Sequence, residues 1–192
     1  MLFNFQLSRS SNIARFDKLN QLNDDKLKYA RWEYGPQKRV LVSPQLLFFS
    51  EKDWIKSSKI ILSLQTFSES RIHRKFDELT RKTQKEEVQV YSLNGDFKGK
   101  IFNTDDLSYG VEVTHNTVES NAFAQEIEIS ENKIISLSAK TPITTRYPSD
   151  GSQYLTLAGY VDYRKKFNNA TLNLGFRPVS YTHLRAHETR HY

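Results

Sequence analysis

The sequence contains no cysteine among its 192 residues, so a disulfide framework and a thiolate metal site are both excluded. It also has no run approaching the ~20 consecutive apolar residues that a membrane-spanning helix needs. Hydrophobic residues make up only 38% of the chain, whereas aromatic residues reach 12%, with 10 Tyr and 12 Phe. This combination is unusual for a small soluble core. It suits a protein whose apolar surface is spread thinly along strands.

The charge balance is basic but mixed. The chain has 28 Lys and Arg against 22 Asp and Glu, a formal net charge of +6. A basic balance raises nucleic acid or an anionic surface as a partner. The two signs are interspersed, however, as in "RKTQKEE", which is typical of a solvated rim, and we expect no nucleic-acid partner. No secretory signal is visible, because Met1 runs straight into "LFNFQLS". We therefore expect either a cytosolic protein or a chain whose natural N-terminus lies further upstream.

Apolar and polar residues alternate with a period of two in most of the chain. In "QYLTLAGYVDYRKKF", Leu155, Leu157 and Val161 share one face, and Thr156 and Asp162 share the other. The segments "SKIILSLQTFSESRI", "EVQVYSLNGDFKGKI" and "LSYGVEVTHNTV" show the same pattern, which indicates half-buried strands. A tight hairpin is expected at "NNA", between "QYLTLAGYVDYRKKF" and "TLNLGFR".

The pattern predicts an all-β fold, an antiparallel up-and-down meander. Its seven long strands are expected near residues 2–9, 38–49, 58–76, 87–101, 107–130, 153–167 and 171–178. Short turns are expected at 50–57, 102–106 and 168–170, and long polar connections at 10–37, 77–86 and 131–152. Within 10–37, a short surface helix and an irregular loop are equally good interpretations. Aromatic residues gather beside the short turns: Phe48, Phe49, Trp54, Phe97, Phe102, Tyr109 and Phe167.

Strand length and loop asymmetry favour part of a transmembrane β-barrel over a soluble β-sandwich. Such barrels have strands of about ten residues, apolar outside and polar inside, with aromatic girdles and long loops at one end only. Only helices and closed barrels can satisfy every backbone group in hydrocarbon. The polar face carries Glu69, Arg71, Glu112, Asp162 and Arg164, which suits a watery lumen. We therefore expect an open, curved sheet that is neither closed nor packed against a second sheet.

Several segments, in order, resemble one family. "GYVDYRKKFNNATLNLGFR" resembles a hairpin of TonB-dependent outer-membrane receptors. "SRSSNIARFDKL", "KYARWEYGPQKR", "SRIHRKF", "VQVYSLNGDF", "YGVEVTHNTVESNAF" and "TRYPSDGSQY" are similar to the same region of Bacteroidetes-type receptors. The similarity runs over about residues 2–178. We therefore expect residues 1–178 to be a partial receptor barrel.

The resemblance implies a function for the whole receptor. Such receptors are plugged barrels of about 22 strands. They lie in the outer membrane of Gram-negative cells, where they contact lipid and import iron chelates (siderophores), haem, cobalamin or glycans. TonB supplies the energy through a plug domain and a TonB box, neither of which is visible here. The chain would then be an internal fragment.

The last residues have a different origin on this interpretation. "VSYTHLRAHET" (Val179–Thr189) resembles, codon by codon, translated adapter DNA from sequencing-library preparation. We therefore expect 179–192 to be a non-native tail that does not continue the sheet. Its three histidines, His183, His187 and His191, lie four residues apart, but they are expected to bind no metal.

The sequence predicts no catalytic residues, no metal site and no bound cofactor, and the protein is not expected to be an enzyme. Five loop-proximal residues are candidates to face a ligand: Arg71, His73, Arg74, Arg146 and Tyr147. The arginines and the tyrosine suit a basic, aromatic mouth for an anionic chelate, and ordinary rim charge is the competing interpretation. His73 could ligate haem iron, but a lone histidine facing a lumen is more often simply part of the polar lining. His115 falls on the apolar face.

A second hypothesis belongs to another class. The chain would be a soluble, basic β-domain that binds nucleic acid or polysaccharide. It predicts a soluble monomer without detergent, whereas a partial barrel should aggregate through its edges and apolar face.

Overall fold

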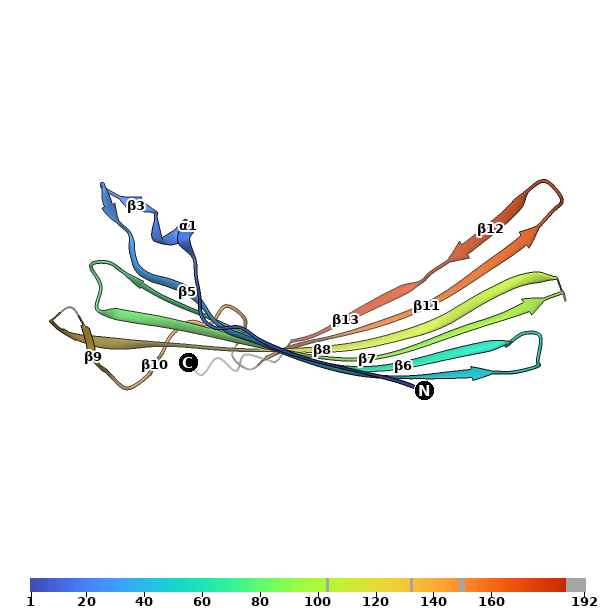
Figure 1. The fold of residues 1–192 in the computed structure, drawn as a ribbon, viewed down its shortest axis with the longest axis horizontal. Coiled ribbons are helices and arrows are strands. Elements are labelled where there is room, and N and C mark those ends of the chain that lie inside the picture. The colour runs from blue at the N-terminus through green and yellow to red at the C-terminus, as the bar shows by residue number, and fades with distance from the viewer. Residues whose placement is uncertain (103, 132, 149–150, 186–192) are drawn as a thin grey trace.

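The protein is an open antiparallel sheet. The computed structural model describes residues 1–102, 104–131, 133–148 and 151–185. Strands account for 75% of the described residues and helix for 2%. Seven strands pair in the order in which the chain visits them (Figure 1): β1 (Leu2–Arg9), β5 (Tyr29–Phe49), β6 (Ser57–Lys75), β7 (Thr80–Ile101), β8 (Asp105–Ser130), β11 (Ser152–Lys166) and β12 (Thr171–Phe176). The predicted open meander is confirmed.

The remaining elements are short. They are β2 (Ile13–Ala14), α1 (Phe16–Leu19), β3 (Leu22–Asn23), β4 (Lys26–Leu27), β9 (Lys133–Leu137), β10 (Thr141–Pro142) and β13 (Val179–Arg185). Two of them, β3 and β4, pair only with each other in a separate two-stranded sheet. β2 extends the edge of β5, and β9 and β10 extend the edge of β8. No helix in the described part of the chain is long and apolar enough to cross a membrane.

The two ends of the sheet differ, as Figure 1 shows. One end carries the β5–β6, β7–β8 and β11–β12 turns at the predicted short connections, and the other carries α1, β3 and β9. Two predicted loops are wrong. Residues 29–37 extend β5, and 80–86 extend β7, so the β6–β7 connection shrinks to 76–79. These extensions have polar residues on both faces, so they lack apolar alternation. Their backbones nevertheless complete the ladder with β6 and β8.

The predicted behaviour of the tail is also wrong. Val179–Arg185 forms β13, which pairs with residues 152–158 of β11, beyond the segment of β11 that pairs with β12. Gly159 N–H donates to Pro178 O at 3.2 Å, so the chain continues past the proline along the same edge. Alternating β-formers in "VSYTH" meet the open edge of β11, and edge pairing needs little sequence specificity. Residues 186–192, with His187 and His191, lie outside the described part.

The sheet has one apolar and one polar face over its middle. We define the apolar belt as Phe3, Phe5, Val42, Leu46, Phe48, Ile60, Leu62, Leu64, Tyr91, Leu93, Phe97, Tyr109, Val111, Val113, Leu155, Leu157 and Val161. Cross-strand register places these residues on one face, because partners in a ladder point the same way. His115 lies opposite Tyr91 and Leu155, on the belt side as predicted.

The opposite face carries the polar residues and is cross-linked by them. Ser63 Oγ donates to Ser43 Oγ at 3.0 Å, between β6 and β5. Tyr160 Oη reaches from β11 across Gly110 of β8 to donate to Asp96 Oδ1 of β7 at 2.8 Å. A Cβ at position 110 would overlap the Tyr160 ring, so this span requires glycine. We call this side the polar face.

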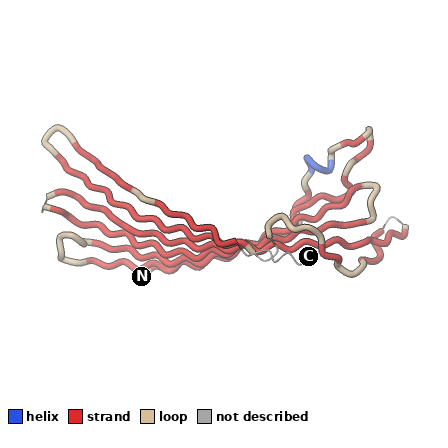
Figure 2. Tube along the Cα trace, turned by 180° about the vertical axis from the view of Figure 1, so that it is seen from behind, coloured by secondary structure: helices blue, strands red, loops and turns tan. Residues whose placement is uncertain are grey.

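A single layer leaves the sheet without a core (Figure 2). Within the described ranges, the buried hydrophobic residues are Ala122, Ile127 and Ala158. The belt is open instead, with Leu62, Val111 and Leu157 each more than half exposed. Hydrophobic burial within the chain therefore contributes little, and the belt is an unpartnered apolar surface.

Candidate functional site

A pocket lies on the polar face, towards the end with the longer connections. It is an open depression with a volume of about 360 Å³, which is within the usual range for small-ligand sites. We call it the polar-face pocket, and its lining consists of Phe67, Glu69, Arg71, Glu86, Val88, Val118, Arg146, Tyr147 and Tyr154. Three of the five predicted ligand-facing residues, Arg71, Arg146 and Tyr147, therefore lie together.

Strand register builds the floor of the pocket. Phe67, Val88 and Val118 are direct cross-strand partners on β6, β7 and β8, and they form an apolar row. Glu69 and Glu86 are partners one step further along the strands. Two carboxylates directly opposite each other are destabilising unless other groups compensate for them. The Glu69–Glu86 pair therefore needs compensating groups nearby.

Glu69 has partners within the sheet. Gln37 Nε2 donates to Glu69 Oε2 at 2.9 Å, and Arg71 Nε lies 3.6 Å from Glu69 Oε1. The Arg71 guanidinium also lies over the Tyr34 ring, 5.8 Å from its centroid. The distance of 3.6 Å is a charge contact and is too long for a hydrogen bond. Arg71 Nε is buried and has no hydrogen-bond acceptor among the described residues.

Glu86 is different, because its carboxylate has an open position. The residue is only 8% exposed. Its Oε1 is buried and accepts no hydrogen bond from any residue that the structure describes. Leaving a buried polar atom unsatisfied costs about 1–3 kcal/mol, and more when the group is charged. The pocket thus presents one vacant acceptor, Glu86 Oε1, and one vacant donor, Arg71 Nε.

The segment after β10 supplies the outer wall. Ile143 N–H donates to Ala122 O at 3.1 Å, which holds this segment against β8. Thr145 Oγ1 donates to Tyr147 O at 2.5 Å. The Arg146 guanidinium lies 5.6 Å from the Tyr147 ring centroid, a cation–π distance. The wall therefore adds a cation and an aromatic ring from outside the sheet.

The other two predicted residues lie elsewhere. His73 is on the polar face but beyond the pocket lining, and its ring is perpendicular to the Tyr29 ring at a centroid distance of 6.4 Å. Arg74 is on the opposite face, where it pairs in register with Arg31. Its guanidinium donates to Glu78 O at 3.0 Å and so fastens the β6–β7 turn. The structure thus separates Arg74 from the ligand-facing candidates.

The same turn contains an ion pair. Lys75 Nζ lies 2.7 Å from Glu78 Oε1, and this hydrogen bond holds the pKa of the Glu78 carboxyl below its usual value. The same contact raises the pKa of Lys75. The pair is solvent-exposed, so its contribution to stability is small. The Lys75–Glu78 pair belongs to the β6–β7 turn and does not line the polar-face pocket.

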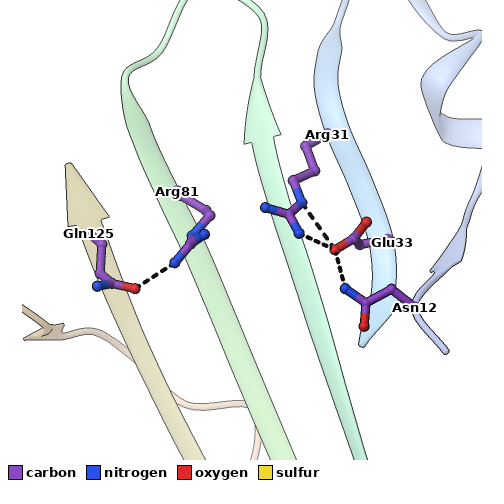
Figure 3. A network of polar contacts seen from close by, with 5 residues as sticks. All are labelled: Asn12, Arg31, Glu33, Arg81 and Gln125. Atoms are coloured by element: carbon purple, nitrogen blue, oxygen red, sulfur yellow. Dashed lines mark hydrogen bonds and ion pairs between the residues drawn. The ribbon is translucent and has the colours of Figure 1, made fainter. Parts of the chain in front are cut away.

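Arg31 and Arg81 belong to a polar network on the belt side (Figure 3). Glu33 accepts hydrogen bonds from Arg31 and, at 2.7 Å, from Asn12 Nδ2. Arg81 donates to Gln125 Oε1 at 2.8 Å. These hydrogen bonds lie on the same side as the apolar belt but beyond its end, where the sheet continues with polar residues. Within the described ranges, no group of three or more His, Asp or Glu residues could hold a metal ion.

Sequence reasoning missed Glu86, Gln37 and Tyr154 as site residues. Glu86 and Gln37 were assigned to loops, because both faces of the sheet are polar at that end. Their place on the polar face follows from the β6–β7 register and from the irregularity of β5 between Gly35 and Lys38. Alternation continued from "EVQVY" back through Glu86 would have revealed the first. No sequence signal identifies the face of Gln37, because the irregularity between Gly35 and Lys38 changes which face of the sheet the following residues take.

Comparison of the chain with family models, with curated proteins and with solved structures finds no match.

Proposed function

We propose that this chain forms part of the wall of an outer-membrane transport barrel of the TonB-dependent receptor type. In this proposal the apolar belt faces lipid and the polar face lines the lumen. Further strands would pair with the outer edges of β1 and β12. The barrel would take up a scarce small-molecule ligand actively, with energy supplied through TonB.

The observation that carries the proposal is the apolar belt on a single-layer sheet. With Val40 and Leu107, which share its face, the apolar stretch covers nine residues on β5 (40–48) and seven on β8 (107–113). A tilted strand needs about 9–11 residues to cross a bilayer. Aromatic rings lie at its tight-turn end, where Phe97 and Tyr109 stack at a centroid distance of 5.2 Å. A water-soluble sheet of this kind would need a second layer over the belt, and the described residues provide none.

The two tryptophans give a direct test. Trp54 lies in the β5–β6 turn, at the aromatic end of the belt, and Trp32 lies at the far end of β5. Trp32 is eight residues from Val40, or about 26 Å along the strand. The variants Trp32→Phe and Trp54→Phe leave one tryptophan each. Both are refolded into vesicles whose lipids carry bromine near the headgroup.

The proposal predicts strong quenching of Trp54 fluorescence and little quenching of Trp32. Equal quenching of both, or of neither, contradicts it. A chain that stays monomeric and folded in buffer without lipid or detergent would instead favour a soluble binding domain.

A further inference from the structure

The polar-face pocket has a charge pattern that differs from the one expected for an anionic chelate. It contains two guanidinium groups, Arg71 and Arg146, and two carboxylates, Glu69 and Glu86. The formal charges cancel. A ligand with only negative charge would meet Arg71 and Arg146 but would lie against two acidic groups, one of them nine-tenths buried. A purely cationic ligand would meet the opposite difficulty.

We infer that the pocket binds a zwitterionic ligand of the amino-acid type, with its ammonium group at Glu86 and its carboxylate at the arginines. This inference rests on the proposed function, because the pocket lies on the face that would line the lumen, and it narrows the class of ligand. An α-ammonium donates to Glu86 Oε1, the vacant acceptor. An α-carboxylate accepts from Arg71 Nε, the vacant donor. Both buried open positions are then filled by one small group.

The walls fit the remainder of such a ligand. The apolar row of Phe67, Val88 and Val118 forms the floor on which a side chain can pack. Tyr147, which is 41% exposed, contributes an aromatic face at the entrance. A volume of about 360 Å³ accommodates an amino acid or a short peptide end.

Glu86 is also placed to discriminate. Glu69 already accepts a hydrogen bond from Gln37 and faces Arg71, so it is compensated without ligand. Glu86 lacks such partners among the described residues, so binding of an ammonium removes a cost that the free protein carries. A ligand without the ammonium leaves that cost in place.

The probes are L-phenylalanine, N-acetyl-L-phenylalanine, which lacks the ammonium, and L-phenylalaninamide, which lacks the carboxylate. The full chain is refolded in detergent micelles, its strand content is checked by circular dichroism, and each probe is titrated by isothermal calorimetry. Phenylalanine is expected to bind at least tenfold more tightly than either derivative. Equal binding of the N-acetyl derivative, or no binding of phenylalanine to the folded chain, overturns the inference.

Variants test which residue contacts the ammonium group of the ligand and which contacts its carboxylate. Glu86→Gln is expected to weaken phenylalanine binding at least tenfold and to leave binding of the N-acetyl derivative unchanged. Arg146→Gln should weaken phenylalanine but not phenylalaninamide. Glu87→Gln is the matched control, because Glu87 is the next residue on β7, points to the other face and pairs with Lys85 at 3.7 Å. An equal effect of Glu86→Gln and Glu87→Gln overturns the assignment.

The two proposals fail separately. If phenylalanine binds but lipid does not quench Trp54 fluorescence, the zwitterion site is supported and the proposed membrane-barrel wall is refuted. If lipid quenches Trp54 fluorescence but phenylalanine does not bind, the membrane-barrel wall is supported and the zwitterionic ligand class is refuted.

Discussion

An arginine in place of Leu93 tests which solvent the apolar belt meets. Leu93 lies mid-belt on β7, between its cross-strand partners Leu62 and Val113. Its side chain is 42% exposed within the chain, so an arginine fits without steric conflict. The cost of Leu93→Arg therefore comes from the surroundings of the sheet rather than from its packing.

The two possible surroundings predict different magnitudes. If lipid covers the belt, an arginine near the bilayer midplane costs about 2–4 kcal/mol. That range lowers the folding equilibrium constant by roughly 30- to 1000-fold. If water covers the belt, a surface substitution of this kind stays within about 0.5 kcal/mol.

Ser92→Arg is the matched control. Ser92 precedes Leu93 and points to the polar face, between Ser63 and Thr114. We expect it to change stability by less than about 0.5 kcal/mol, as for a lumen or surface position. The free energy of unfolding is measured for each variant in lipid vesicles, by guanidinium titration followed through tryptophan fluorescence. A loss of similar size in both variants, or no loss for Leu93→Arg, would refute the assignment of the belt to lipid.

Three further predictions concern the sheet itself. The new Cβ of Gly110→Ala overlaps both the Tyr160 ring and the Gly95 carbonyl oxygen. It breaks the Tyr160 hydrogen bond to β7, so we expect a loss of at least about 1–3 kcal/mol in the same titration, and adding Tyr160→Phe to this variant should cost little more. The Lys75 contact lowers the folded-state pKa of Glu78, so its stabilisation is present above the unfolded pKa and disappears as pH falls through the folded value. The protection factors of amides in the β6–β7 turn, which correct for the intrinsic pH dependence of exchange, should therefore fall at acid pH, and Glu78→Gln should remove this fall. Deleting residues 179–192 should expose alternate amides in the half of β11 that pairs with β13, while the half that pairs with β12 stays protected in hydrogen exchange.

The predictable part of the fold is the part where one face is apolar. The alternation of Leu62 and Leu64 with Ser63 identifies both the strand and its faces, because a half-buried sheet imposes a period of two. Residues 80–86 carry "TRKTQKE", which has no apolar period, so the pattern could not separate strand from loop there. Backbone pairing with β6 and β8 decides that segment, and this information is not local.

In the candidate site, too, some residues could be placed from local alternation and others only from the folded structure. Arg71 was placed correctly, because it continues the alternation of β6 beyond the belt. Arg146 and Tyr147 were chosen for their chemistry, and only the fold of the segment after β10 brings them to Arg71. Arg74 illustrates the limit of choosing residues by composition. It is one position from His73 in the sequence, yet strand geometry turns it to the other side of the sheet.

The uninterrupted register of β7 and β8 also bears on how this protein can evolve. These strands pair through twenty-two consecutive steps without a bulge. Losing a single codon inside residues 105–118 would exchange every later side chain between belt and polar face, whereas most single substitutions there move only one. Length variation among natural variants should therefore concentrate in residues 10–28 and 131–151, where the chain leaves the long ladder, and the spacing from Leu107 to Val118 should be fixed even where its letters change.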